Sequence, residues 1–292
     1  MNILFISNED PFTSLGGAGQ NSLGLIENLL KKEDVNIEYR KPQLIDASDI
    51  LGYDLFILED FWGFPDDLVD LFLEEKYIIF ENSYGFASDK FLGFHKREQK
   101  WIEKDLRHKY FYQCAEKVYL QSWFQYTIFE MNGLDFGNLE CLDGNFWTEE
   151  SIRTLEKYRF ERDVDANIYP SPEDTYYVIL DGKNPLHQKV KGVQEAVDYA
   201  KEKKLFCQII SPASYDEYLK ILSNSAGLIF LPTVPETFSR VYIEAKYLNV
   251  SVISNNNIGA KRSSWNEGVF FPHKMMTFNS SASNKVWKQL NQ

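Results

Sequence analysis

The chain has 292 residues, which is enough for two domains of ordinary size. Hydrophobic residues make up 44% of it and aromatic residues 15%, which excludes an intrinsically disordered protein and predicts a packed core. The formal net charge of −12 gives no basic footprint for nucleic acid or an anionic membrane. A small molecule or a neutral acceptor is therefore favoured as the ligand.

The cysteines and the hydropathy pattern indicate a compartment. Cys114, Cys141 and Cys207 are odd in number, lie far apart and lack metal-ligand spacing, so we expect reduced thiols in the cytoplasm. The apolar start, residues 1–6, is too short for a signal peptide and has no charged beginning. No run approaches the roughly 20 apolar residues of a membrane span. We expect a cytoplasmic protein without a transmembrane segment.

The first strand and helix are joined by a glycine-rich turn. Residues 2–7 are apolar and predict a buried strand, and Leu25, Ile26 and Leu29 mark an amphipathic helix. Between them stands Gly16-Gly17-Ala18-Gly19. Such a turn lets the backbone approach a phosphate or a sugar closely. The alternative is a tight turn that only packs the helix on the sheet.

Strands and helices continue to alternate along the first half of the chain, which predicts βαβ units and a parallel sheet. A charged stretch with spaced apolar positions, 94–112, predicts a solvent-exposed helix face, with a basic rim for an acceptor as the alternative. The expected strands are 35–39, 53–58, 77–80, 115–122 and 139–142, and the expected helices are 66–75 and 123–131.

A linker is predicted over 162–174, where two prolines and several acidic residues replace the hydrophobic pattern. The predicted domains are therefore 1–165 and 174–292. Asp163-Val-Asp165 has the form of a metal-binding D-x-D motif. Because no strand precedes it and no third ligand is in view, we interpret it as part of the linker.

The second domain repeats the alternation and adds two cations. Lys183 and Lys191 lie before the start of a predicted helix. Two cations beside a helix N-terminus suit an anionic ligand such as a diphosphate. The expected strands are 175–180, 205–210, 226–231, 250–254 and 268–271, and the expected helices begin near 193 and 215.

The most informative stretch is Pro235-Glu236-Thr237-Phe238-Ser239-Arg240-Val241-Tyr242-Ile243-Glu244-Ala245. It follows a buried strand, and Thr237 or Ser239 can cap the helix that begins there. The N–H groups of the helix start favour an anion at the carboxyl edge of the sheet. Glu236 in the loop and Glu244 in the helix can accept hydrogen bonds from hydroxyl groups. This combination suits a nucleotide sugar.

The same stretch resembles the E-x7-E signature of retaining GT-B glycosyltransferases of the family 4 type. The resemblance implies an α/β fold of two doubly wound, Rossmann-like domains with parallel sheets and a cleft between them. The first domain would face the acceptor, and the second would bind the nucleotide sugar. The implied reaction is front-face transfer with retention, with a UDP-sugar favoured as donor. No metal or further cofactor would be required, and the acceptor would be a carbohydrate, lipid-linked or other hydroxyl compound.

The resemblance also assigns roles to residues. Glu236 would hold the transferred sugar, Glu244 the ribose, and Lys183 and Lys191 the diphosphate. Many members carry His-Gly after the strand at 77–80, where this chain has Asn82, Ser83 and Tyr84, so Asn82 or Ser83 would replace the histidine as a sugar contact. We predict that Glu236→Ala loses transfer while the protein stays folded. The remaining expected donor contacts are Gly16, Gly17, Phe238, Ser239 and Arg240.

The resemblance leaves three other functions open. GT-B enzymes usually close with long helices that return to the first domain, and the short end at 284–292 predicts that this cap is truncated. A noncatalytic nucleotide-binding protein of this fold would bind nucleotide without transfer or hydrolysis. A nucleotide-sugar epimerase would release nucleotide and a changed sugar without acceptor. A glycosyltransferase acting on modified DNA bases would show salt-sensitive DNA binding, against which the net charge argues.

Overall fold

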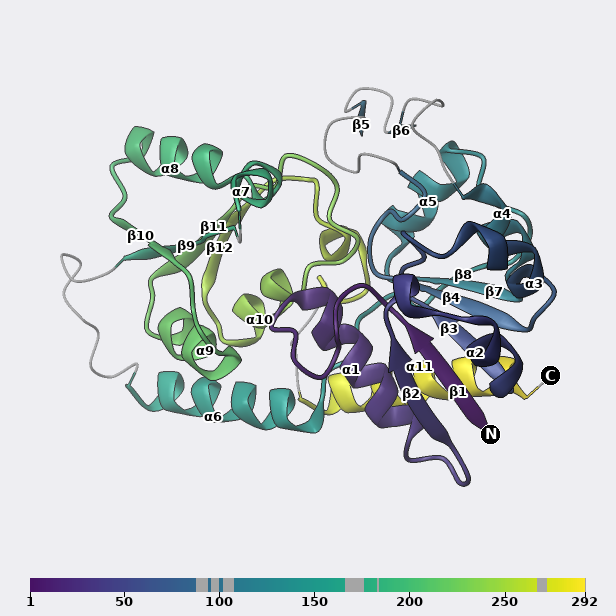
Figure 1. Cartoon of the computed structure of the whole chain (residues 1–292). Coiled ribbons are helices and arrows are strands. Elements are labelled where there is room, and N and C mark those ends of the chain that lie inside the picture. The colour runs from purple at the N-terminus through teal and green to yellow at the C-terminus, as the bar shows by residue number, and fades with distance from the viewer. Residues whose placement is uncertain are drawn as a thin grey trace. The chain divides into compact units, whose positions relative to one another are not determined.

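A computed structural model describes residues 1–87, 94–95, 100–101, 108–165, 176–182, 184–266 and 272–291. The chain forms two compact units (Figure 1). Unit 1 contains Met1–Thr148 and Met275–Gln292, and unit 2 contains Glu149–Lys274. Each unit is built around one parallel sheet, so the predicted α/β class and the predicted parallel pairing are confirmed.

Unit 1 has a six-stranded sheet in the order β2-β1-β3-β4-β7-β8. Each pair of neighbouring strands in it is parallel. Short apolar runs form the central strands β1, β3 and β4, because both faces of a parallel sheet are buried, whereas the edge strand β2 is more polar and only partly buried. The strands are β1 (Asn2–Ile6), β2 (Asn36–Arg40), β3 (Leu55–Leu58), β4 (Tyr77–Glu81), β7 (Lys117–Leu120) and β8 (Leu139–Cys141).

Helices cover both faces of this sheet. Side chains alternate between the faces of a strand, so Leu4 and Ile6 join one core cluster while Ile3 and Phe5 join the other. The first cluster includes residues of α2, α3, α4 and α5, and the second includes residues of α1 and α11. Unit 1 is therefore doubly wound. The helices are α1 (Gly17–Leu29), α2 (Ala47–Gly52), α3 (Val69–Leu73), α4 (Lys109–Cys114), α5 (Trp123–Met131) and α11 (Pro272–Leu290), with 3-10 turns at Pro42–Leu44 and Asp66–Leu68.

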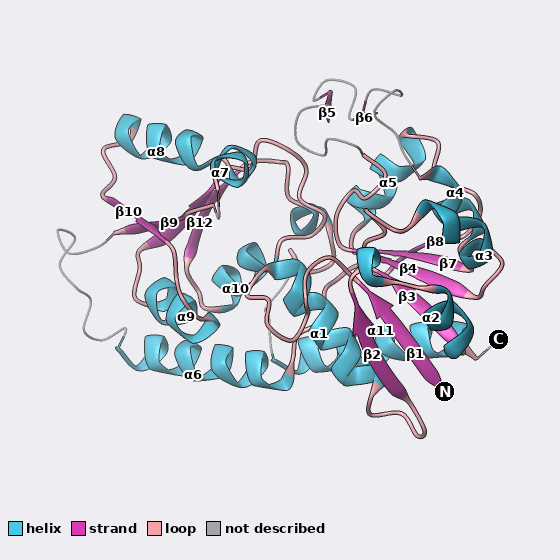
Figure 2. Ribbon diagram, viewed as in Figure 1, coloured by secondary structure: helices cyan, strands magenta, loops and turns pink. Residues whose placement is uncertain are grey.

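Unit 2 has a four-stranded parallel sheet in the order β10-β9-β11-β12. Figure 2 shows α8 on one side of this sheet and α9 on the other. The strands are β9 (Tyr177–Leu180), β10 (Cys207–Ile210), β11 (Gly227–Phe230) and β12 (Ser251–Ser254). The helices are α6 (Glu149–Asp165), α7 (Pro185–Lys191), α8 (Val193–Glu202), α9 (Tyr215–Ser223) and α10 (Arg240–Tyr247), with a 3-10 turn at Gly259–Arg262.

The division of the chain differs from the predicted one at both ends of unit 2. Residues 149–165, which the prediction placed in the first domain, form helix α6 of unit 2, where Ile152, Leu155 and Tyr158 are buried and the helix packs against α9. The C-terminal cap is not truncated. Helix α11 has 19 residues, and most of it belongs to unit 1, where Val286 and Leu290 lie in the core. Its many polar residues concealed it at the level of the sequence.

Two further predictions concern residues 94–112 and 268–271. Phe94–His95 and Lys100–Trp101 form an antiparallel pair, β5 and β6, so the helix expected through 94–112 is wrong at these positions. The strand expected over 268–271 lies outside the described residues. Within the described part of the chain, no helix combines the length and apolar character that a bilayer span requires.

Candidate functional site

The loop between β11 and α10 carries Glu236 and is fixed through its backbone. Glu236 N donates to Asn257 O at 2.7 Å, and Gly259 N donates to Glu236 O at 3.1 Å. The side-chain amides of Asn255 and Asn257 both donate to Pro232 O at 2.8 Å. The loop after β11 and the loop after β12 are thus joined at the carboxyl edge of the sheet, where open α/β sheets bind ligands.

The end of α7 is fixed beside the same loop. Thr233 N donates to Val190 O at 2.9 Å. Gly192 follows with φ 68°, and a Cβ there would lie 1.8 Å from Leu231 O. Only glycine combines that backbone conformation with so close an approach. The turn between α7 and α8 therefore holds Lys191 against the loop of Glu236.

Lys191 and Glu236 form an ion pair at this edge. Lys191 Nζ lies 2.7 Å from Glu236 Oε1, and the two side chains keep 41% and 15% of their exposure. The same ammonium lies 5.9 Å from the centre of the Phe230 ring. Because a partly exposed pair stabilises a fold little, both groups can turn to a ligand at small cost. A cation and an acceptor are thus presented side by side.

The N-terminus of α10 begins at Ser239, one of the two predicted caps. Ser239 Oγ accepts from Tyr242 N at 3.4 Å, and its φ is 83°. A positive φ in a residue with a Cβ costs about 1–3 kcal/mol and is characteristic of functional sites. The neighbouring Phe238 is fully buried, and its ring packs edge-on against Trp265. Phe238 thus anchors the loop from the core.

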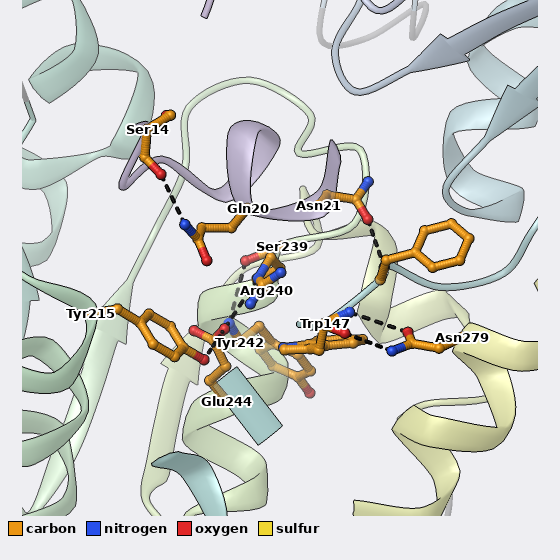
Figure 3. Close-up of polar contacts among 11 residues, drawn as sticks. Ser14, Gln20, Asn21, Trp147, Tyr215, Ser239, Arg240, Tyr242, Glu244 and Asn279 are labelled. Atoms are coloured by element: carbon orange, nitrogen blue, oxygen red, sulfur yellow. Dashed lines mark hydrogen bonds and ion pairs between the residues drawn. The ribbon is translucent and has the colours of Figure 1, made fainter. Parts of the chain in front are cut away.

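Arg240 and Glu244 form a second ion pair, which is buried (Figure 3). Arg240 Nε lies 3.2 Å from Glu244 Oε1, and the side chains are only 3% and 2% exposed. Tyr215 Oη donates to the same carboxylate oxygen at 2.9 Å. Burial and the Glu244 charge raise the pKa of Tyr215 well above its usual value. Glu244 lies in the helix as predicted, but its carboxylate is inside the protein rather than at the surface.

In unit 1, the glycine turn caps α1. Gly16 N donates to Ser14 Oγ at 3.1 Å, and Gln20 Nε2 donates to Ser14 O at 2.9 Å (Figure 3). A Cβ on Gly19 would lie 2.4 Å from Ser14 Cβ, so this glycine serves the packing of the turn. Gly17 is exposed at the first position of the helix. Gly17 thus fits the interpretation in which the backbone approaches a ligand. Gly19 fits the alternative, a tight turn that packs the helix on the sheet.

The residues in place of the family histidine are engaged within unit 1. Asn82 is buried, with Nδ2 2.8 Å from both Ser22 Oγ and Glu59 Oε1. Ser83 N donates to Glu81 Oε1 at 2.8 Å. Tyr84 is buried among the aromatic rings of the core. A sugar or acceptor contact by Asn82, Ser83 or Tyr84 stays a prediction.

Sequence reasoning missed two residues of these edges. Glu59 follows β3 directly, and burial raises its pKa to about 7. Tyr215 begins the helix after β10 and contacts Glu244. The available signal was their position, because both follow strands at the carboxyl edge of a parallel sheet. Lys183, the second predicted cation, lies outside the described residues.

No protein-family model matches the chain, and no curated protein matches it in sequence. Among solved structures, sucrose-phosphate synthase from Thermosynechococcus elongatus is similar with a TM-score of 0.58 and 13% identity, over 99% of this chain and 94% of that one. HepE from Anabaena in complex with UDP-glucose gives 0.54 and 14%, over 99% and 92%.

A third similar structure is the UDP-GlcNAc 2-epimerase from Neisseria meningitidis bound to UDP-GlcNAc. Its TM-score is 0.55 at 9% identity, over 99% of this chain and 100% of that one. At such low identity the likeness shows the fold alone. Together with the two parallel-sheet units, it establishes that this chain has the GT-B fold.

Proposed function

We propose that the protein is a retaining glycosyltransferase that moves a sugar from a nucleotide-diphosphate sugar, favouring a UDP-sugar, to a hydroxyl acceptor. The transfer takes place on the front face of the donor sugar and requires no metal, as the resemblance to the family 4 type implies. Activity that survives chelation of divalent cations supports this form of the mechanism. Loss of transfer on chelation, with recovery on adding a divalent cation, overturns it.

The Lys191–Glu236 pair is the observation that carries the proposal. In a nucleotide sugar, the phosphate next to the sugar and the sugar hydroxyls are neighbouring groups of opposite hydrogen-bonding character. A cation and a carboxylate 2.7 Å apart match that pattern, with Lys191 on the phosphate and Glu236 on the hydroxyls. The loop and the helix end that hold them are fixed by backbone hydrogen bonds, so the site is preorganised.

The chemistry follows from this arrangement. As the bond between the anomeric carbon and the diphosphate breaks, charge builds on the diphosphate, and Lys191 neutralises it together with Lys183. The acceptor hydroxyl attacks the same face and passes its proton to the departing phosphate oxygen, so the configuration is retained. Glu236 orients the sugar through its hydroxyls. The resemblance to the family 4 type adds Gly16, Gly17, Phe238, Ser239 and Arg240 as expected donor contacts.

Glu244 and Arg240 stabilise the helix that follows the site loop. Their buried pair and the Tyr215 hydroxyl fix the first turns of α10 below Ser239. The resemblance assigns the ribose hydroxyls to Glu244. In this chain a ribose bound to Glu244 would share that carboxylate with Tyr215, whose hydroxyl donates to Oε1, which makes Tyr215 part of the proposed donor site.

The similar structures support the donor class. HepE was solved with UDP-glucose, and the Neisseria epimerase with UDP-GlcNAc. The test is a thermal-shift screen of UDP, GDP, ADP and their common sugars on wild type, Glu236→Gln and Lys191→Ala. Saturating ligand stabilises a binding protein by a few kcal/mol, about 2.7 at one hundred times Kd. One nucleotide series should shift wild type, and Lys191→Ala should reduce that shift. Equal shifts in all three proteins would remove the pair from the site.

A nucleotide-sugar epimerase is the second candidate, because one of the similar structures is such an enzyme and nearly the whole of both chains matches. The two reactions separate without an acceptor. Wild type incubated with UDP-GlcNAc alone should leave it unchanged if the protein is a transferase. Release of UDP together with a sugar of altered configuration would establish the epimerase instead.

A further inference from the structure

The first turns of α1 are joined by hydrogen bonds to the ends of three strands of unit 1. The ties come from Asn21 and Ser22 on α1, Glu59 after β3, Asn82 after β4 and Gln121 after β7. We call these five residues the α1 clamp. All of them are buried. The glycine turn is the start of the same helix, so the clamp determines where that turn lies.

Asn82 is the centre of the clamp. Its Nδ2 donates to Ser22 Oγ and to Glu59 Oε1, both at 2.8 Å, and lies 3.4 Å from Ala18 O in the first turn of α1. Its Oδ1 accepts from Asn21 Nδ2 at 2.6 Å and from Gln121 Nε2. An amide has two donors and two acceptor positions, and Asn82 uses all of them inside unit 1.

Asn21 extends the clamp to the loop after β8. Its Oδ1 accepts from Phe146 N at 2.6 Å, while its Nδ2 donates to Asn82. One asparagine of α1 is therefore held from two sides, by backbone on one side and by side chain on the other. The helix start is fixed in rotation as well as in height above the sheet.

Glu59 is the one ionisable member of the clamp. Oε1 accepts from Asn82, and Oε2 accepts from Ser22 Oγ at 2.8 Å. When ionised, the carboxyl group offers only acceptors, so both donors stay directed at it. When protonated, it becomes a donor on one oxygen, and one of the two contacts is lost or reversed. Burial raises the pKa of Glu59 to about 7, so this change falls near neutral pH.

Few other charged or titratable groups face Glu59. Ser7, Ser22 and Asn82 donate to it and carry no charge. The charge of Asp60 adds to the rise in its pKa. Tyr39 at the end of β2 has a pKa raised to about 12 and stays neutral near pH 7. The acids beyond these are Glu9 and Asp10, which act on Tyr39, and Glu81, which accepts from Tyr112, Ser83 and Gly85.

We propose that Asn21, Asn82 and Glu59 are positioning residues that hold the glycine turn of α1 in place for the donor diphosphate, and that this placement requires Glu59 in its ionised form. The inference rests on the proposed function, in which Gly16 and Gly17 contact the diphosphate. It gives Asn82 a role other than the sugar contact of the family histidine. The clamp acts through α1 and does not touch the reacting atoms.

The test measures kcat/KM for the donor from pH 6 to 9, with wild type, Glu59→Gln and Asn82→Asp. Wild type should lose activity as pH falls through about 7. Gln does not titrate and, like the protonated acid, carries a donor on one side, so Glu59→Gln should have a low kcat/KM at every pH and lose this limb of the profile. In Asn82→Asp a second carboxylate faces Glu59, and misplacement of the turn should lower kcat/KM by about 100-fold. Binding of UMP, which the proposed function gives to unit 2, should stay at the wild-type affinity.

The matched control is Asn132→Ala. Asn132 is also a buried asparagine, and its Nδ2 donates to Ile128 O at 2.7 Å at the end of α5. This variant should keep the wild-type profile. If Glu59→Gln retains the wild-type limb, the positioning role falls, even where Asn82→Asp fails to fold. If wild type binds and turns over no nucleotide sugar, the proposed function itself falls and takes the inference with it.

Discussion

The carboxyl edges of the two sheets are built differently, although both follow the same strand-and-helix alternation. In unit 1 the polar side chains at the strand ends bond to one another, as Asn82 does with Glu59 and Asn21. In unit 2 the Lys191–Glu236 pair is partly exposed and joined to the rest mainly through backbone. Each edge carries carboxylates. Glu59 in unit 1 is held in buried hydrogen bonds, whereas Glu236 in unit 2 is partly exposed.

The difference teaches how to separate a binding group from a supporting group. A partly exposed ion pair adds little stability, so its two charges are available to a ligand. A buried polar cluster is costly when any member is lost, so it rigidifies its surroundings. The same contrast exists within unit 2, between Lys191–Glu236 at the surface and Arg240–Glu244 below it. Substitutions should therefore divide into those that change activity and those that change stability.

The largest effect on stability is expected at Glu244. Glu244→Ala leaves the buried Arg240 charge uncompensated, which should lower the free energy of unfolding by about 3–5 kcal/mol. Urea unfolding measures this loss. The double variant Arg240→Met/Glu244→Leu removes both charges and should recover most of it. Glu202→Ala, in an exposed pair with Lys203, is the control and should leave Tm unchanged. A stable Glu244→Ala protein would contradict a supporting role.

The next effect is on catalysis, at Lys191. Lys191→Ala removes a cation from the developing diphosphate charge and should lower kcat by about 100- to 1000-fold. Its free energy of unfolding should fall by about 1 kcal/mol or less, because the Lys191–Glu236 pair is partly exposed. Steady-state kinetics and a thermal melt measure the two quantities. Lys189→Ala, two residues earlier on α7, should keep the wild-type kcat. A folded Lys191→Ala protein with wild-type turnover would break the contrast between the edges.

Glu59 should show the opposite pattern, an effect on stability that depends on pH. A pKa that rises from 4.5 in the unfolded chain to about 7 in the fold means that ionisation opposes folding. The stability from neutral Glu59 is fully present below pH 4.5 and is lost as pH rises through about 7. At pH 8 the free energy of unfolding of Glu59→Gln should therefore be about 3 kcal/mol higher than that of wild type. This difference should vanish near pH 4. Equal stability at pH 8 would contradict the raised pKa.

The smallest effect is expected at the cap of α10. Ser239→Ala removes the acceptor for Tyr242 N and should lower the free energy of unfolding by about 1 kcal/mol. Ser239→Gly should cost less, because glycine tolerates the φ of 83°. Chemical denaturation of the two variants side by side measures the order. If Ser239→Ala lowers the free energy of unfolding less than Ser239→Gly does, the backbone strain at Ser239 is absent in solution.

Much of this architecture is predictable from local signals. Apolar runs gave the strands of both sheets, and the cap of α10 was one of two predicted residues. Helix α7 was not among the predicted helices, although Asn184 and Pro185 mark its start and Gly192 its end. It spans seven residues and buries only Val190, so it offers almost no hydrophobic period to detect.

Single residues of the candidate site were proposed from the sequence, but their contacts and burial were not. Glu236 and Lys191 were both proposed as donor-site residues, and their ion pair was not predicted. The spacing of Arg240 and Glu244 is that of an i,i+4 pair, yet whether such a pair is buried depends on Tyr215 and other residues distant in the chain. The contacts of Asn82 likewise join α1, β3 and β7, and no local pattern reports on them.

Helix α11 has a consequence for how the chain acquires its structure. Ala282, Val286 and Leu290 complete a core that begins with Ile3 and Phe5, and all of unit 2 lies between them in the sequence. During synthesis, the strands of unit 1 are made before α11. The apolar surface that α11 covers therefore stays exposed while unit 2 emerges. Contacts so distant in sequence form slowly, and exposed apolar surface invites aggregation. Unit 2 is continuous in sequence and can fold first, so a nascent chain halted before α11 should depend on chaperones through unit 1 alone.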